Sequence, residues 1–319
     1  MTTGEKIPLV AVLGPTASGK TGLAVQIALR FGGEVVSADS MQIYSGLNIA
    51  TAAPTESEML GVPHHLIGCV PPSEEYSVAR YMSDAAEAIA GIYSRGRLPV
   101  LCGGTGLYAD SLINGMSFED EPDCSELRAE LWQKYQSGGI EPLYARLAAL
   151  DSEAAASIHP NNTKRVLRAL EVCIATGESF TERGKRQAQC ESPYDTLRIV
   201  LRYNDRQKLY DRINKRVDIM LEQGLVDEAR RYYALDGVST ASQAIGYKEI
   251  KPYLDGDISL AEAVENLKRA TRRYAKRQIT WFSRSGDAAA LYCDTPGELP
   301  DRAFALIEEF FKREMKTNE

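Results

Sequence analysis

The eight residues Gly14–Thr21 constrain the fold of this 319-residue chain more than any other stretch. Their sequence, GPTASGKT, matches the phosphate-binding pattern G-x-x-x-x-G-K-[ST] in full. The apolar stretch Ile7–Leu13 before it predicts a buried strand, and Gly19–Phe31 after it has the pattern of a helix. Glycines let backbone N–H groups converge on an anion at a helix start, where the helix dipole favours negative charge. The sequence therefore predicts a phosphate or diphosphate site.

Within this phosphate loop, we expect Lys20 to place its charge on the phosphates and the Thr21 hydroxyl to bind Mg²⁺ or a phosphate oxygen. The loop residues predicted to bind diphosphate are Gly14, Thr16, Ala17, Ser18, Gly19, Lys20 and Thr21. Arg212 and Arg216 are one turn apart on a predicted helix over Asp205–Glu222. They either close over the diphosphate from the opposite side or are ordinary surface arginines.

Strands alternate with helices on both sides of the phosphate loop. Glu34–Ala38 and Leu98–Cys102 are apolar stretches typical of buried strands, and Ser77–Arg95 between them has helical periodicity. This alternation predicts an α/β fold with a P-loop NTPase-like, three-layer core around a parallel sheet. Asp39 and Thr105 follow the second and third strands, so both should lie at the carboxyl edge of the sheet, where ligands bind.

The pattern then changes to helices alone. Three amphipathic segments lie at about residues 125–136, 141–150 and 162–176. A polar stretch over Ser179–Pro193 predicts a loop, and the β-branched stretch Thr196–Tyr203 predicts that the sheet resumes. We therefore expect a helical insertion domain at 115–195, and a core domain with a helical C-terminal part built from 1–114 and 196–319.

Asp39 and Thr105 each allow two interpretations. Asp39 could hold Mg²⁺ or act as a base, or it could cap the next turn. Thr105 lies in the glycine loop GGTGLY, where its hydroxyl could bond a bridging oxygen of a substrate or cap the following helix. Neither Leu98–Cys102 nor Leu197–Tyr203 ends in the acidic residue with which many NTPases hold Mg²⁺, and this weakens the interpretation as an ordinary NTPase.

The net charge of −7 excludes a uniformly basic nucleic-acid binder, but the basic residues are clustered. The segment Lys268–Arg284 has no acidic residue, and its basic side chains are Lys268, Arg269, Arg272, Arg273, Lys276, Arg277 and Arg284. At helical spacing they form two adjacent rows, which predicts a polyanionic partner such as nucleic acid. The alternative is a solvated or internally paired face. Lys164, Arg165 and Arg168 form a second cluster.

Compartment and cofactor class follow from what the sequence lacks. The six cysteines include no C-x-x-C pair, and the three histidines lack metal-ligand spacing, which argues against a zinc site or a disulfide framework. No stretch resembles a signal peptide or a membrane span. We expect a cytoplasmic protein with reduced thiols and no membrane partner.

Taken together, these stretches closely resemble the bacterial type of one family, the tRNA dimethylallyltransferases (tRNA isopentenyltransferases). The matching segments are GPTASGKT at 14–21, SADSMQIY at 37–44, PHHLI at 63–67, GGTGLY at 103–108, IHPNNTKRVLRALEV at 158–172, GYKE at 246–249 and AKRQITWF at 275–282. The resemblance implies transfer of a dimethylallyl group from dimethylallyl diphosphate to N6 of the adenosine 3′-adjacent to the tRNA anticodon, with diphosphate released.

The resemblance also implies roles for the site residues. The phosphate loop would hold the diphosphate leaving group with Mg²⁺, and Arg216 would contact the same group with Arg212 nearby. Asp39 and Thr105 would be catalytic: Asp39 would accept a proton from the adenine amine or orient it, and Thr105 would bond the oxygen that bridges prenyl group and diphosphate. Thr21 is the expected protein ligand of the metal.

The partner implied is the anticodon stem-loop of tRNA, bound by a monomer. The implied contacts are Asp39, Ser40, Met41, Gln42, Arg128, Lys164, Arg165, Val166, Leu167, Arg168, Gln243, Ala244, Ile245, Gly246, Tyr247, Lys248, Lys276, Arg277, Gln278, Ile279, Thr280, Trp281, Phe282 and Ser283. Arg128 is the expected side chain filling the space around the flipped base. The alternatives are an adenylate isopentenyltransferase acting on free nucleotides, a small-molecule P-loop kinase, and a non-catalytic nucleic-acid binder.

Overall fold

The computed structural model describes residues 6–116, 124–235, 244–284, 286–295 and 299–317. The chain forms two compact units, one built from 1–113 and 193–319 and the other from 114–192. These boundaries lie within three residues of those expected from the change in sequence pattern. Among the described residues, no helix is both long enough and apolar enough to cross a lipid bilayer.

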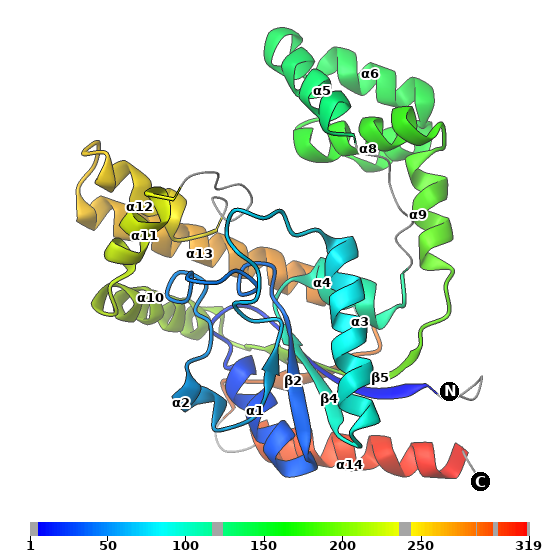
Figure 1. Ribbon diagram of the computed structural model, residues 1–319, viewed down its shortest axis with the longest axis vertical. Helices are drawn as coiled ribbons and strands as arrows, with labels where there is room; N and C mark the ends of the chain where they lie inside the picture. Colours follow the sequence, from blue (N-terminus) through cyan, green and yellow to red (C-terminus); the bar gives the residue numbers. More distant parts are fainter. Residues whose placement is uncertain (1–5, 117–123, 236–243, 285, 296–298, 318–319) are drawn as a thin grey trace. The chain divides into compact units, whose positions relative to one another are not determined.

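The first unit contains a parallel sheet (Figure 1). Its strands are β1 (Ile7–Leu13), β2 (Gly33–Ala38), β3 (His64–His65), β4 (Leu98–Gly103), β5 (Tyr194–Arg202) and β6 (Ala289–Tyr292). Their order across the sheet is β3-β2-β4-β1-β5-β6. The strand before the phosphate loop is therefore central, between β4 and β5, and the insertion joins two segments of one continuous sheet.

Helices cover both faces of this sheet, which confirms the three-layer α/β prediction. The helices of this unit are α1 (Lys20–Phe31), α2 (Glu56–Met59), α3 (Val78–Ser94), α4 (Gly106–Ile113), α10 (Arg206–Glu222), α11 (Leu225–Tyr233), α12 (Tyr247–Leu254), α13 (Leu260–Phe282) and α14 (Leu299–Thr317). Successive side chains of β1 point to opposite faces. Val10 and Val12 join the core under α1 and α14, whereas Leu9, Ala11 and Leu13 join the core under α3 and α4 (Figure 1).

The second unit is helical, as expected. It consists of α5 (Ser125–Gly138), α6 (Glu141–Leu150), α7 (Ser152–Ser157), α8 (Thr163–Thr176) and α9 (Phe180–Ala188). The prediction of a loop over Ser179–Pro193 is wrong, because α9 occupies most of it. Ser179 caps the helix by accepting a hydrogen bond from the Glu182 N–H at 3.2 Å, so its start signal was present in the sequence.

Candidate active site

Three loops meet where β1, β2 and β4 end, because these strands are parallel neighbours. The phosphate loop follows β1, Asp39–Gln42 follows β2, and Gly104–Thr105 follows β4. The Thr105 N–H donates to the Ala38 carbonyl at 3.1 Å, which joins the second and third of these loops. The structure thus confirms that Asp39 and Thr105 lie at the same edge of the sheet as the phosphate loop.

The phosphate loop has a left-handed backbone at Ala17 (φ 62°) and at Gly19 (φ 88°). Two of its N–H groups are already used: that of Thr16 donates to Gln278 Oε1 at 2.8 Å, and that of Ser18 donates to the Pro15 carbonyl at 3.3 Å. The first N–H groups of α1 have no partner within the helix, so they are the donors best placed for an anion.

Three cations surround the loop. Burial lowers the pKa of Lys20, and the nearby Asp39 carboxylate partly opposes this effect. Burial also lowers the pKa of Arg216, again against the effect of Asp39. The Arg216 guanidinium donates to Thr16 Oγ1 at 3.5 Å and to the Ala52 carbonyl at 3.2 Å, while Arg212 Nε donates to the Ala17 carbonyl at 2.9 Å. Both arginines therefore lie against the phosphate loop, as the first of the two interpretations expects.

Two cavities have Arg216 in their lining. A cavity of about 590 Å³ is lined by Lys20, Thr21 and Arg212, and by the 48–55 loop. A second cavity of about 240 Å³ is lined by apolar side chains together with Asp39, Tyr274 and the cations Arg216, Lys248 and Arg277. These apolar side chains include Ile213, Val217, Met220 and Leu267. Ala52, Arg216 and Met220 line both cavities, so the two cavities are neighbours on either side of these residues.

The apolar wall and Tyr274 were missed as site residues by the sequence reasoning. Ile213, Val217 and Met220 recur at i, i+4 and i+7 on α10, the helix that also carries Arg212 and Arg216. That row was the available signal, but the same spacing is typical of any helix that faces a core.

Asp39 both caps a turn and faces the second cavity, so the two interpretations of this residue coexist. Its Oδ1 accepts hydrogen bonds from the N–H groups of Met41 at 2.9 Å and Gln42 at 3.3 Å. Among the described residues, Oδ2 accepts no hydrogen bond. The cap thus fixes the carboxylate while leaving one oxygen for a proton or a ligand.

The Thr105 hydroxyl links the two loops beside it. Its Oγ1 accepts a hydrogen bond from the Ser40 N–H at 3.0 Å and donates to Ser40 Oγ at 3.2 Å. The hydroxyl is therefore engaged with Ser40 rather than with the N-terminus of α4. To donate to a bridging oxygen of a substrate, the Thr105 hydroxyl must give up its hydrogen bond to Ser40 Oγ, because it has one proton to donate.

Gln278 on α13 ties the phosphate loop to the glycine loop. It is 4% exposed, accepts from the Thr16 N–H at 2.8 Å and donates from Nε2 to the Gly104 carbonyl at 2.9 Å. A Cβ on Gly104 would lie 2.2 Å from Gln278 Nε2, and a Cβ on Gly106 would lie 2.3 Å from the Trp281 ring. These glycines permit close packing of α13 on the loop.

The basic face of α13 divides into two rows with different surroundings. Lys268 pairs with Asp218 at 2.7 Å, and Arg272 donates to Asn214 Oδ1 at 2.6 Å, so this row is bound to α10. The exposed side chains are Arg269, Arg273, Lys276 and Arg277. In the described part of the chain, none of these four forms an ion pair. The internally paired interpretation therefore holds for Lys268 and Arg272, and the surface left for a polyanion is formed by the four exposed cations.

Several residues that were predicted to contact tRNA have buried side chains. They are Val166, Leu167, Ala244, Tyr247, Gln278 and Phe282, together with the buried Gly246. The matched segments are amphipathic helices, so each one includes core positions as well as surface positions. Trp281 is partly exposed but donates to Asp110 Oδ2 at 2.6 Å. Gln243 lies outside the described residues.

In the second unit, Lys164 and Arg165 are exposed. Arg128 and Arg168 instead bind the buried Glu171, at 2.9 Å and 2.6 Å. They also lower the pKa of Glu171 against the effect of its burial. Arg128 was expected to fill the space around a flipped base, but its guanidinium is bound within its own unit.

Among the described residues, no three His, Cys, Asp or Glu side chains cluster as a metal site. Thr21 lines the first cavity and Asp39 lines the second, and each carries a side-chain oxygen. Such a hard-oxygen set fits Mg²⁺ that is bound mainly through substrate phosphates and water.

Comparisons with known proteins agree with this geometry. The sequence matches the family model for IPP transferase over residues 42–285 and the model for isopentenyl transferase over residues 7–67. It is 45% identical over 316 residues to a tRNA dimethylallyltransferase from Caldanaerobacter subterraneus, covering 98% of this chain and 94% of the relative.

Solved structures show the same similarity. A tRNA isopentenylpyrophosphate transferase from Bacillus halodurans matches with a TM-score of 0.73 and 43% identity, over 98% of this chain and 100% of that one. A eukaryotic dimethylallyltransferase captured acting on tRNA matches with a TM-score of 0.83 and 31% identity, over 96% of this chain and 80% of that one.

Proposed function

This chain belongs to the IPP transferase family, and on that premise we propose that it is a tRNA dimethylallyltransferase. It transfers the dimethylallyl group of dimethylallyl diphosphate to N6 of the adenosine 3′-adjacent to the anticodon. The bond between the allylic carbon and the bridging oxygen breaks, a bond from N6 to that carbon forms, and diphosphate leaves.

The observation that carries this proposal is the junction of the two cavities at Arg216. A diphosphate fits the side with Lys20, Thr21 and Arg212, and a short apolar group fits against Val217 and its neighbours. A donor with one charged end and one apolar end matches a site that has Lys20 and Arg212 on one side and the apolar row of α10 on the other.

Positively charged groups of the protein lie where the reaction builds negative charge. As diphosphate departs, negative charge grows beside Lys20, Arg216 and the first N–H groups of α1, which are fixed before the reaction begins. The adenine amine is a weak nucleophile, because its lone pair is delocalised into the ring. Asp39 Oδ2 can accept a proton from that amine as the N–C bond forms.

Mg²⁺ held by the diphosphate and the Thr21 hydroxyl would add further positive charge on the leaving group. The protein's own task at this point is to keep Asp39 and Lys20 oriented and to exclude water from the allylic carbon.

The acceptor proposal rests on the exposed row of α13 and on Lys164 and Arg165 in the other unit. These cations lack an ion-pair partner among the described residues, which suits contacts to phosphates. A free nucleotide would not need exposed cations on either unit, so these side chains favour RNA over the adenylate alternative.

The test incubates the purified protein with labelled dimethylallyl diphosphate, Mg²⁺ and either unmodified tRNA or AMP. We expect label in tRNA and none in AMP. Label in AMP alone would replace the proposal with an adenylate isopentenyltransferase. Turnover of ATP without any prenyl transfer would replace it with a kinase.

A further inference from the structure

Glu228 on α11 is a buried carboxylate with no role in the proposed chemistry. It is 4% exposed, and its bonds with described residues are to two backbone N–H groups and one phenol. It accepts from the N–H of Ile49 at 2.9 Å, the N–H of Ala50 at 2.8 Å and the Tyr247 hydroxyl at 2.7 Å. A buried carboxylate held in this way fixes the backbone that it binds.

The fixed backbone is the loop Ile49–Ala52, which lies between the two cavities. The Ala52 carbonyl accepts from Arg216 at 3.2 Å, and it also accepts from Gln42 Nε2 at 3.1 Å. Glu228 is therefore connected, through two or three residues of main chain, to the guanidinium at the cavity junction.

One backbone feature shows that this loop is held against its own preference, and a second shows how closely α12 packs on it. Ala52 has a left-handed backbone with φ of 49°, a conformation that is unfavourable for a residue other than glycine. Gly246, just before Tyr247, would place a Cβ 3.1 Å from the Ala50 Cβ, so glycine allows α12 to approach the loop. Such strain persists only where neighbouring contacts fix the conformation.

We propose that Glu228 and Tyr247 are positioning residues for diphosphate binding, acting through the loop Ile49–Ala52 on Arg216. This assigns Gly246 and Tyr247 of the GYKE segment to the donor side of the reaction rather than to direct contact with tRNA. The inference rests on the proposed function only for the identity of the donor.

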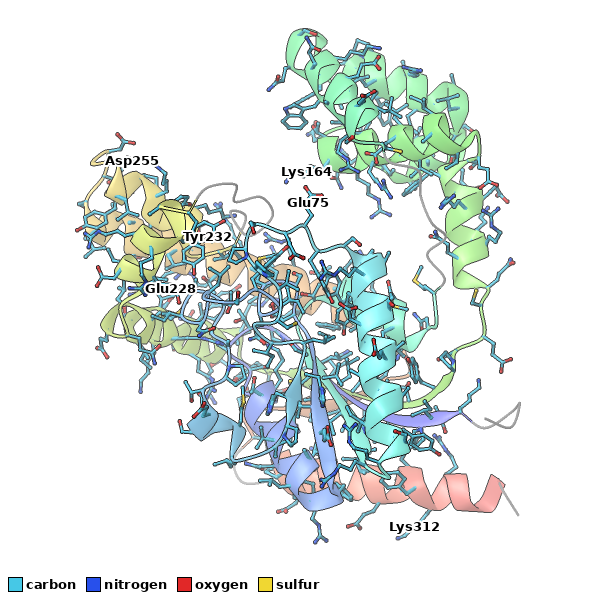
Figure 2. All side chains as sticks on the ribbon, viewed as in Figure 1. Glu75, Lys164, Glu228, Tyr232, Asp255 and Lys312 are labelled. Carbon is cyan, nitrogen blue, oxygen red and sulfur yellow. The ribbon has the colours of Figure 1, made fainter. Side chains whose placement is uncertain are left out.

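The chain offers a matched control in Tyr232, which stacks on Tyr247 with ring centroids 4.5 Å apart (Figure 2 labels Glu228 and Tyr232). Both tyrosines are buried, but the Tyr232 hydroxyl has no hydrogen-bond partner among the described residues. Tyr247→Phe and Tyr232→Phe therefore remove the same atom from neighbouring rings, and only the first removes a bond to Glu228.

The experiment measures binding of inorganic pyrophosphate with Mg²⁺ by titration calorimetry, the KM for donor and for tRNA, and the melting temperature. We expect Tyr247→Phe to weaken pyrophosphate binding about threefold to tenfold, and Glu228→Gln about tenfold or more, with the KM for tRNA unchanged. Tyr232→Phe should match wild type. Unchanged pyrophosphate affinity in Glu228→Gln, even with a lower melting temperature, would overturn the proposal.

A double-mutant cycle with Arg216→Lys tests whether Glu228 affects pyrophosphate binding through Arg216. If Glu228 acts through Arg216, adding Glu228→Gln to Arg216→Lys should weaken pyrophosphate binding little further. Fully additive losses would show that the two residues act independently and would also overturn the proposal. If wild type binds pyrophosphate but transfers no prenyl group, the proposed function fails while these comparisons still decide the role of Glu228.

Discussion

Asp39 is the residue on which the chemistry depends most, and one of its two carboxylate oxygens is already bound by the turn that follows. Asn at this position keeps an acceptor for the Met41 and Gln42 N–H groups but removes the charge. We expect Asp39→Asn to lower kcat by about 100-fold or more, the contribution typical of a proton acceptor. Affinity for tRNA should be retained. A kcat close to wild type would exclude Asp39 as the base.

Gln278 allows a second prediction at this scale. Gln278→Leu leaves the Thr16 N–H and the Gly104 carbonyl without partners in a buried place, at about 1–3 kcal/mol for each group. We expect a lower melting temperature and a higher KM for the donor. Thr280→Ala, two residues along the same helix and exposed, is the control. An unchanged donor KM in Gln278→Leu would show that the link to the phosphate loop has no effect on binding.

The place of a single functional residue was predictable where a reactive side chain directly follows a strand. Lys20 and Asp39 follow strands in a known pattern, so their place at the sheet edge came from the sequence alone. Gln278 and Glu228 were not predictable as site-supporting residues. Their partners lie far away in the chain, 262 residues away for Gln278 and Thr16, and local pattern carries no such information.

At the scale of elements, α13 separates the bound row of basic residues from the exposed one. Arg269→Glu with Arg273→Glu should weaken tRNA binding and reduce the slope of its salt dependence, because phosphate contacts are lost. Lys268→Gln is the control: it breaks the pair with Asp218 and should leave the salt slope unchanged. Equal slopes for the double variant and wild type would remove α13 from the RNA-binding surface.

The helical unit has a pH-dependent element at Asp151, which caps α7 and also binds Ser179 and Thr181. Burial alone raises its pKa, but the hydrogen bonds from Ser179, Ala154 and Thr181 outweigh burial and lower it to about 2. Because the folded pKa lies below the unfolded value of about 3.9, the stabilisation is complete above that value. It is lost as the pH falls from about 4 to about 2.

Hydrogen exchange of α7 and α9 in the full chain checks this prediction. Protection should decline through that pH range in wild type, and Asp151→Asn should show low protection with little pH dependence. A wild-type profile that is flat between about pH 4 and pH 2 would contradict the assigned role of Asp151.

Elements with a clear apolar pattern were predicted well, and two of the shortest were not. The strand over Ile7–Leu13 and the helix over Glu141–Leu150 match the structure residue for residue. The two-residue strand β3 and the four-residue helix α2 were missed. Their pairing and caps depend on neighbours more than on pattern, and so few residues give no measurable period.

For the whole molecule, the net charge of −7 and the basic face of α13 coexist because charge is sorted along the chain. The alternation of strands and helices was enough to predict the three-layer core and the place where the helical unit is inserted. The charge sum could not predict which cations are exposed. That depended on Asp218 and Asn214 lying next to α13 in the fold.

The central claim is prenyl transfer to one adenosine of tRNA, and nucleoside mass spectrometry tests it most directly. Two transcripts of one tRNA, with A or G 3′-adjacent to the anticodon, are incubated with the protein, dimethylallyl diphosphate and Mg²⁺. We expect one prenylated adenosine per molecule in the first transcript and none in the second. No prenylated nucleoside in either transcript, or equal prenylation of both, would contradict it.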